Sequence, residues 1–331
     1  MVPEETITGL AVSAGGFILG LAGAFIMSRY AYRLGLIDLP NARSSHIVPT
    51  PRGGGAGILG AFILGASLLH LPTGIWCPGV LLAVLSFFDD RIELSPKMRL
   101  GFQFAAAIIV VAVIGVRNNN PSLSLFLKIF WPLFIVATTN FYNFMDGIDG
   151  IAGITGVVAF LLIVLFGHLS GALQSHLFLA FGLAMSCIGF LLFNFPKAKV
   201  FMGDVGSVLL GFIFAVFVFW LTERFTDFFC LVSFLLPFYA DTMTTLYVRF
   251  QDGEKISQAH RRHLYQVLVN EFRYKHWQVS LGYGVTQLLF GLLMIWAWRT
   301  GIIWQVTVFS LFSVVFFICM LRVRKIVGAT G

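Results

Sequence analysis

Charged residues are scarce in this sequence: Asp, Glu, Lys and Arg together make up 11% of its 331 residues. A soluble domain of this length needs far more charge on its surface. The chain also lacks a polar stretch long enough for a separate soluble domain, and it shows no internal repeat or low-complexity segment. These absences argue against a soluble or multidomain protein and favour a single integral membrane domain over residues 1–331.

Cysteine is equally rare. The four cysteines (Cys77, Cys187, Cys230 and Cys319) all lie within apolar runs. We interpret them as small buried apolar residues rather than as disulfide partners or zinc ligands.

The first residues, MVPEET, lack the basic region of a signal peptide, so we expect the first apolar run to be a retained helix.

Hydrophobic residues make up 58% of the chain and recur in runs that suit a helix crossing a bilayer. We expect an all-α, polytopic membrane protein with eleven transmembrane helices. The runs are residues 7–28, 53–70, 72–88, 101–116, 123–140, 151–169, 175–193, 206–221, 228–248, 277–298 and 302–321. The run at 72–88 is the weakest, because it is short and contains Pro78.

The basic residues give an orientation. If the connections alternate sides, 18 of the 22 Lys and Arg residues fall on one side and four (Arg117, Lys128, Arg224 and Arg299) on the other. The positive-inside rule makes the richer side cytoplasmic, with the N-terminus periplasmic and the C-terminus cytoplasmic in a bacterial inner membrane. Nucleic acid is excluded as a partner, because no soluble basic domain exists to bind it. Anionic membrane lipid and an anionic substrate both remain as explanations.

Acidic residues gather on the same side as the basic ones. Eight of them fall in its connections: Asp89, Asp90, Glu93, Asp146, Asp149, Asp204, Asp252 and Glu254. Carboxylates among basic residues at helix ends suggest a site that holds a cation and a polyanion together.

The first acidic motif is FFDDRIEL, residues 87–94. Asp89 and Glu93 are four residues apart and Asp90 and Glu93 three apart, so each pair shares a face of a helix. Neighbouring carboxylates repel one another unless a hard cation such as Mg²⁺ neutralises them. A solvated helix end is the alternative explanation.

The second motif is NFYNFMDGIDG, residues 140–150. Asn140, Asn143, Asp146 and Asp149 follow at intervals of three, which makes one polar ridge on a helical path. The glycine after each aspartate lets backbone approach a ligand closely. A helix end and turn would explain one Asp-Gly pair but not a ridge of four polar residues.

The third motif is FMGDVGS, residues 201–207, in which glycines stand on both sides of Asp204. Asp204 precedes an apolar run, so it either caps a helix or reaches a metal ion beside the other acids.

The fourth motif is AHRRHLYQ, residues 259–266, in the longest polar connection. Zinc is a poor fit to His260 and His263, because no cysteine lies near them. Arginine with histidine suits a phosphate, and a basic loop that touches lipid is the alternative.

Pro237 and Asp241 lie inside an apolar run instead. A carboxylate at that depth is either functional or part of a kink that the proline introduces.

Taken together, these motifs resemble the polyprenyl-phosphate N-acetylhexosamine-1-phosphate transferases, which include the lipid I-forming translocase and the enzymes that initiate O-antigen synthesis. The resemblance covers nearly the whole chain through six motifs in the family's order. They are DLPNARSSHIVPTPRGGG (38–55), DDRIELSPKMRLGFQ (89–103), NFYNFMDGIDGIAG (140–153), FMGDVGS (201–207), PFYADT (237–242) and AHRRHLYQ (259–266).

The resemblance implies that a cytoplasmic UDP-N-acetylhexosamine gives its sugar-1-phosphate to polyprenyl phosphate and that UMP leaves. It implies Mg²⁺ as the cofactor, with Mn²⁺ as the alternative. Asp204 is then expected to bind the metal, with Asp89 and Asp90 close by and one of that pair acting as the base. Asn143 and Asp146 are expected to line the catalytic centre.

Further roles follow from the same resemblance. Asp149 is expected to contact uracil, helped by Gly147 and Ile148, with Phe201 packed against the base. The diphosphate or the sugar is expected to lie against His260, Arg262 and His263. Lys97 matches a basic family position near the lipid phosphate.

The sequence departs from the family pattern at two places. Glu93 stands where many members have Asp, Asn or Lys, and H-R-R-H replaces the triple histidine of the lipid I enzyme. The second departure argues against a muramyl-pentapeptide substrate and favours the O-antigen branch. The alternatives are a membrane prenyltransferase that uses a prenyl diphosphate, and a cation-coupled transporter. The sugar, the length of the polyprenyl chain and the oligomeric state, with a homodimer as one option, stay open.

Overall fold

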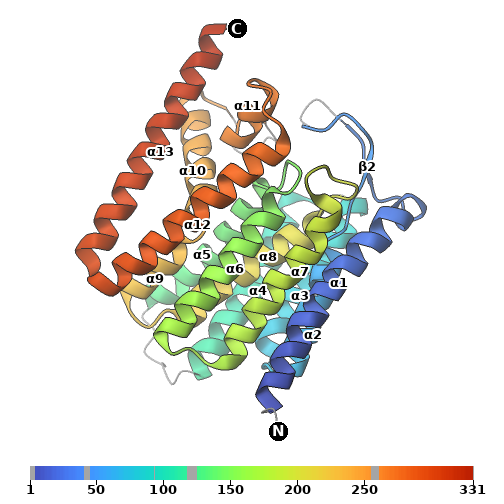
Figure 1. The fold of residues 1–331 in the computed structure, drawn as a ribbon, viewed down its shortest axis with the longest axis vertical. Helices are drawn as coiled ribbons and strands as arrows, with labels where there is room; N and C mark the ends of the chain where they lie inside the picture. The colour runs from blue at the N-terminus through green and yellow to red at the C-terminus, as the bar shows by residue number, and fades with distance from the viewer. Residues whose placement is uncertain (1–3, 41–44, 93, 118–124, 255–260, 331) are drawn as a thin grey trace.

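The computed structural model describes residues 4–40, 45–92, 94–117, 125–254 and 261–330, and these residues fold almost entirely into helices (Figure 1). The helices are α1 (Glu4–Leu34), α2 (Ala56–Leu68), α3 (Thr73–Ile92), α4 (Pro96–Arg117), α5 (Leu125–Phe144), α6 (Ile151–Ser170), α7 (Gln174–Asn194), α8 (Asp204–Leu221), α9 (Phe225–Ser233), α10 (Leu236–Gln251), α11 (Leu264–Asn270), α12 (His276–Thr300) and α13 (Ile302–Thr330). Two short antiparallel strands, β1 (Ile37–Asp38) and β2 (Thr50–Pro51), join α1 to α2.

The predicted all-helical, polytopic architecture is confirmed, and each predicted apolar run overlaps a helix of the described residues. Within the described residues, seven helices are long and apolar enough to cross a membrane, or up to eight if α9 and α10 form one span. α2 has 13 residues, so it is about 20 Å long, whereas a bilayer's hydrocarbon core is about 30 Å thick. Eleven complete crossings therefore stay a prediction.

The predicted helix at 228–248 is broken into α9 and α10, whose axes differ by 80°. The break falls at Phe234 and Leu235, ahead of Pro237, and not at the proline itself. Pro237 lies in the first turn of α10, where a missing backbone N–H breaks no helical hydrogen bond. The proline thus begins a new helix rather than kinking a continuous one.

The central helix of the structure is α8. Every residue from Val205 to Phe219 is buried, and the helix packs against α3 and α5. A helix that is apolar on all sides is stable only when other helices surround it. Because α8 begins at Asp204, this arrangement places a carboxylate at the mouth of the helical core.

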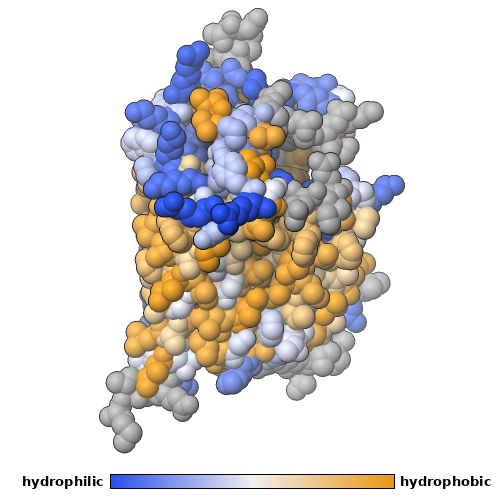
Figure 2. All heavy atoms as spheres, turned by 90° about the vertical axis from the view of Figure 1, so that its right-hand side faces the viewer, coloured by the Kyte–Doolittle hydropathy of each residue, from blue (hydrophilic) through white to orange (hydrophobic). Residues whose placement is uncertain are grey.

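The two ends of the molecule differ in character. Figure 2 shows hydrophilic side chains gathered at one end, above a broad apolar band. In Figure 1, the connections α5–α6 and α7–α8 lie at that end together with α11 and β2, while the chain's N-terminus lies at the opposite end. The motifs that the sequence analysis placed on one face therefore lie at one end of the molecule.

We predict that this polar end is cytoplasmic, because the sequence count assigns 18 of the 22 Lys and Arg residues to the side that carries its connections. Phosphatase fusions after residues 172 and 223 should be active, since these connections lie at the other end. Matched fusions after residues 197 and 253 should be inactive. Activity at 197 or 253 would contradict the orientation and leave the fold unchanged.

Candidate active site at the start of helix α8

The core of the site is a backbone pairing between two distant motifs. The N–H of Phe201 donates to the carbonyl of Pro51 at 2.7 Å, and the N–H of Gly54 donates back to Phe201 at 2.9 Å. The N–H of Gly55 donates to the carbonyl of Met202, also at 2.9 Å. The first motif is thereby fixed alongside the residues that lead into α8.

Glycines make this close approach feasible. A Cβ on Gly55 would lie 2.4 Å from the Cα of Gly206, inside the first turn of α8. Gly203 has φ +72° and ψ 166°, a conformation that only glycine adopts readily. Gly55, Gly203 and Gly206 therefore have identifiable tasks. The chain turns sharply at Gly203, just before Asp204, and the backbones at Gly55 and Gly206 touch.

Asp204 lies where α5 and α8 meet. The amide of Asn143, near the end of α5, hydrogen-bonds the Asp204 carboxylate. Ser207, one turn into α8, donates its hydroxyl to Oδ1 of Asn143 at 2.5 Å. The structure thus brings Asn143 beside Asp204, and Ser207 orients the amide, while the predicted catalytic role of Asn143 stays a prediction.

Asp89 approaches the same centre from the end of α3. It is buried; its Oδ1 accepts the N–H of Leu94 at 2.6 Å and its Oδ2 lies 2.6 Å from Nε of Arg99. Nη1 of the same arginine lies 3.9 Å from Oδ2 of Asp204. Arg99 thus bridges the two acids.

Two other acids of this motif cannot be placed. The side chain of Asp90 and the whole of Glu93 lie outside the described residues. The predicted roles of Asp90 therefore stay predictions.

Two cavities meet at this centre, and both include Asn143, Asp204 and Gln266 in their lining. The smaller one, about 250 Å³, is polar and draws on several motifs. Its lining residues are Asp38, Ser45, His46, Arg52, Asn143, Asp146, Gly147, Ile148, Asn194, Phe201, Gly203, Asp204 and Gln266. Of the predicted residues, Asp146, Gly147, Ile148 and Phe201 are thus brought together with Asp204.

The larger cavity, about 1260 Å³, lies between α3, α4, α5 and α10. Asp89 and Arg99 lie on it near Asp204, and leucine and phenylalanine side chains make up much of the remaining wall. A ligand with a charged head and a long apolar tail would match this change of lining.

The loop with the sequence DGIDG is held tightly. A Cβ on Gly147 would lie 2.2 Å from Oη of Tyr265, so only glycine fits there. Asn194 accepts the N–H of Gly150 at 2.8 Å and donates to the carbonyl of Val200 at 2.9 Å. Asn194 therefore ties this loop to the segment that precedes Phe201.

The side chain of Asp149 lies against α12 and not against either cavity. It is absent from the linings of both cavities, and its Oδ2 lies 3.2 Å from Nδ1 of His276 at the start of α12. Its carbonyl accepts the hydroxyl of Ser280 at 2.7 Å. The predicted contact of Asp149 with uracil stays a prediction, and the observed contacts are those of a residue that positions the loop.

The residues of the H-R-R-H motif do not share one environment. His260 lies outside the described residues. Arg262 is absent from the linings of both cavities; its Nη2 lies 2.6 Å from Asp252 and its Nη1 pairs with Glu254. His263 lines the larger cavity. The phosphate contacts predicted for this motif stay predictions.

Lys97 is exposed in the first turn of α4 and is absent from the linings of both cavities. Its predicted place near a lipid phosphate is likewise untested.

Asp241 has an identifiable structural task. The carboxylate is fully buried and accepts the N–H groups of Leu264 at 2.8 Å and Tyr265 at 3.2 Å, which open α11. It also accepts the hydroxyl of Tyr283 at 2.7 Å. A negative charge at a helix start is favourable, so Asp241 holds α11 against α10 and α12.

Several lining residues had no role assigned from the sequence, namely Asp38, His46, Arg52, Arg99, Asn194 and Gln266. All of them except Asn194 lie in motifs that the sequence analysis quoted, yet only the fold shows which of their side chains reach a cavity. The ring of His46 packs edge-on against Phe201, with 4.9 Å between centroids.

The oxygen atoms around Asp204 suit Mg²⁺. Among the described residues, no group of three or more His, Cys, Asp or Glu side chains is arranged to hold a metal ion. Mg²⁺ is commonly held by one or two carboxylates, with water and substrate phosphates completing its shell. Asp204, with Asp89 and Asn143 nearby, fits that mode of binding.

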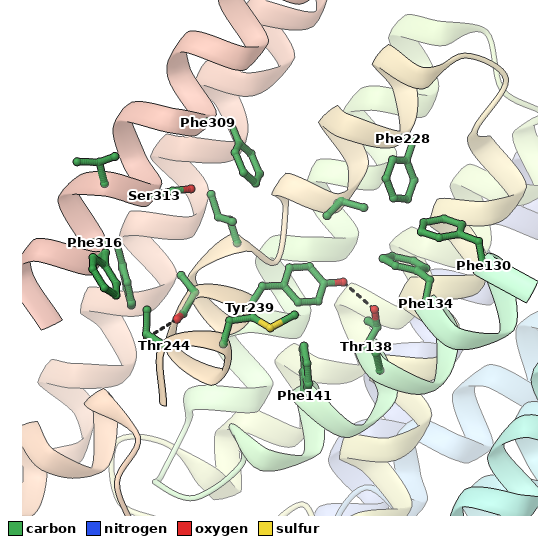
Figure 3. A pocket seen from close by; sticks show the side chains of 17 residues that line it. Phe130, Phe134, Thr138, Phe141, Phe228, Tyr239, Thr244, Phe309, Ser313 and Phe316 are labelled. Atoms are coloured by element: carbon green, nitrogen blue, oxygen red, sulfur yellow. Dashed lines mark hydrogen bonds between the residues drawn. The ribbon is translucent and has the colours of Figure 1, made fainter. Parts of the chain in front are cut away.

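A third cavity, about 690 Å³, also borders α5 and is shown in Figure 3. Phenylalanines from α5, α9 and α13 surround it, and Tyr239 hydrogen-bonds Thr138 across it at 2.9 Å. It has no charged lining residue, so we assign no reacting group to it.

The fold and the site define a class: a polytopic helical membrane protein in which a polar cavity and a more apolar one share Asn143, Asp204 and Gln266 in their linings. The chain is similar to glycosyl transferase family 4, whose model matches its residues 72–222. It is 30% identical to a probable undecaprenyl-phosphate N-acetylglucosaminyl 1-phosphate transferase of Bacillus subtilis, over 58% of this chain and 57% of the relative.

Two further relatives carry related names. The undecaprenyl-phosphate alpha-N-acetylglucosaminyl 1-phosphate transferases of Yersinia pestis and Salmonella typhi are 29% and 28% identical to this chain. The matches cover 59% and 80% of this chain, and 58% and 77% of the relatives. The chain thus matches little more than half the length of the first relatives, which are polyprenyl-phosphate hexosamine-1-phosphate transferases by name.

The pairing at α8 should not tolerate a methyl group at Gly55. We expect Gly55→Ala to lower the free energy of unfolding by about 1–3 kcal/mol, because the new Cβ meets backbone that cannot move aside. Gly60→Ala is the matched control, since its Cβ would meet nothing closer than 3.9 Å. Thermal unfolding in detergent measures both, and equal melting temperatures would contradict the steric argument.

The carboxylate of Asp241 should be needed for α11 to form. In Asp241→Asn the amide nitrogen would face N–H donors, so we expect a loss of about 1–3 kcal/mol and faster hydrogen exchange at residues 264–270. Thr242→Val is the control, because the buried Thr242 hydroxyl has no hydrogen-bond partner among the described residues. Unchanged exchange in Asp241→Asn would show that α11 is held by packing alone.

Proposed function

We propose that the protein transfers N-acetylhexosamine-1-phosphate from a UDP-sugar to polyprenyl phosphate and releases UMP. One observation carries the proposal: Asp204 and Asn143 lie in the shared wall of a polar cavity and an apolar one. A reaction between a water-soluble donor and a lipid acceptor needs two such compartments with the reacting groups at their junction. The names of the relatives describe the same kind of acceptor.

The smaller cavity is the proposed donor site. Phe201 supplies an aromatic face for uracil, and Gly147 and Ile148 supply backbone beside it. Asn143, Asp146 and Asp204 line the same cavity, and the diphosphate would lie against them. In this proposal the uracil lies against Phe201 and the reacting phosphorus near Asp204.

The larger cavity is the proposed acceptor site. Its polar part, at Asp89 and Arg99, suits the phosphate head of the lipid, and its apolar part suits the isoprenoid chain. Arg99 is fit to hold a phosphate oxygen, because a guanidinium bonds phosphate through two N–H groups. Asp89 or Asp90 would take the proton of the lipid phosphate.

In the proposed step an oxygen of the lipid phosphate attacks the phosphorus that bears the sugar. A new P–O bond forms, the bond to the bridging oxygen breaks, and UMP carries that oxygen and its electron pair away. Mg²⁺, or Mn²⁺ as the alternative, would bind at Asp204 and supply positive charge to the diphosphate. The contribution of the chain is to align two anions that repel each other.

We further propose that this product initiates a lipid-linked polysaccharide of the bacterial cell envelope, with the O-antigen as the preferred candidate. The H-R-R-H motif supports this, because it departs from the triple histidine of the lipid I enzyme. The relatives favour N-acetylglucosamine as the first sugar to test. A prenyltransferase or a transporter is not favoured by either the relatives or the paired cavities.

The test is to incubate purified protein with Mg²⁺, undecaprenyl phosphate and a panel of UDP-N-acetyl sugars, and to measure UMP. We expect UMP release that requires both the lipid phosphate and the metal. Asp204→Asn should reduce the rate by about 100-fold or more, because it removes the charge at the junction of the cavities. Lys199→Ala, an exposed change at the same end of the molecule, is the control.

Two results would overturn the proposal. Pyrophosphate released from a prenyl donor would identify a prenyltransferase. Ion flux in liposomes without any UMP would identify a transporter. An Asp204→Asn variant that releases UMP at the wild-type rate would leave the reaction in place and remove Asp204 from it.

A further inference from the structure

The charges of the smaller cavity are unbalanced. Among its lining residues, three are carboxylates (Asp38, Asp146 and Asp204), whereas Arg52 is the one lysine or arginine. A nucleotide diphosphate adds more negative charge than one divalent metal ion cancels. Without a cation of its own, this cavity would repel the donor that the site requires.

Arg52 is well placed to be that cation. Its own N–H donates to the carbonyl of Leu36 at 3.0 Å, and Pro51 before it and Gly54 two residues after it both pair with the backbone of Phe201. The backbone of Arg52 is therefore held beside Phe201, in the cavity that Phe201 and Asp204 also line. Its guanidinium is half-buried and interacts electrostatically with Asp204.

The cation that the sequence favoured, Arg262, is engaged elsewhere. It pairs with Asp252 and with Glu254, and Glu254 also lies 2.8 Å from Nε of the buried Arg249. Hydrogen bonds from Arg249 and then Arg262 lower the pKa of Glu254, so this carboxylate stays charged. To reach the smaller cavity, Arg262 would have to leave two ion pairs.

We infer that Arg52 binds the diphosphate of the nucleotide sugar directly, between Phe201 and Asp204. The inference rests on the proposed function, because it takes a nucleotide diphosphate as the ligand of the smaller cavity. It goes beyond the proposed function, because it assigns phosphate binding to the motif at residues 38–55 and not to the H-R-R-H loop alone. The ring of His46 packs edge-on against the ring of Phe201, and its Nε2 lies 4.0 Å from Oδ2 of Asp38.

The experiment measures how much the phosphates add to nucleotide affinity. Uridine, UMP and UDP are titrated against the full-length protein in nanodiscs at a fixed concentration of Mg²⁺. In the wild type we expect affinity to rise from uridine to UDP. In Arg52→Ala we expect uridine to bind as before, while the gain from the two phosphates falls by about tenfold or more, or about 1.4 kcal/mol.

Two further variants sharpen the comparison. Arg52→Lys should recover part of the lost gain, because lysine keeps the charge but not the paired geometry of the guanidinium. Lys199→Ala removes one positive charge from an exposed position at the same end of the molecule and should bind all three ligands like the wild type. Thermal unfolding of each variant confirms that it is folded.

Three results would overturn the inference. Arg52→Ala could keep the full gain from the phosphates, or lose uridine and UDP affinity in equal proportion, which would show a structural role only. A gain that is lost in Arg262→Ala and kept in Arg52→Ala would return phosphate binding to the H-R-R-H loop. Failure of the proposed function is distinguishable, because the wild-type protein itself would then neither bind UDP nor release UMP.

Discussion

The site depends on one contact, the approach of Gly54 and Gly55 to the backbone that leads into α8. Three hydrogen bonds fix residues from near the start of the chain against residues more than 140 positions later. Without this contact, Arg52, Phe201 and Asp204 would not line the same cavity. Bulkier side chains would separate the two segments, so the motif's glycines are a packing requirement and not only a source of flexibility.

A second constraint is electrostatic. Asp89 and Asp204 lie close together at the edge of an apolar core, where unpaired carboxylates are costly to bury. Arg99 contacts both, and the amide of Asn143 hydrogen-bonds Asp204, so neither charge is left uncompensated. The same partners keep the two acids at fixed positions. Such fixed charges can act on a substrate without first having to reorganise.

The helical architecture and the grouping of the motifs could be predicted, because hydropathy and charge can be read from short stretches of the chain. The helical runs and the grouping of the acidic motifs at one end followed from them. The roles of Arg52 and Arg99 did not, because a cation's partner depends on which distant segment folds beside it. The break at Phe234 and Leu235 was misplaced for a related reason: proline marks a helix start as readily as a kink. Asp241 needed the fold to show that it caps α11.

Asp204 has an arginine in each of the two cavities that it lines. Arg52 lines the polar cavity, Arg99 lines the apolar one, and the aspartate is shared by both. Two phosphate-bearing molecules repel each other strongly as they approach. In the reaction that we propose, a cation on each side lowers that repulsion, and the two ligands stay in separate cavities until they meet at the shared wall. A single cluster of cations would bind either anion but would not set the direction from which one approaches the other.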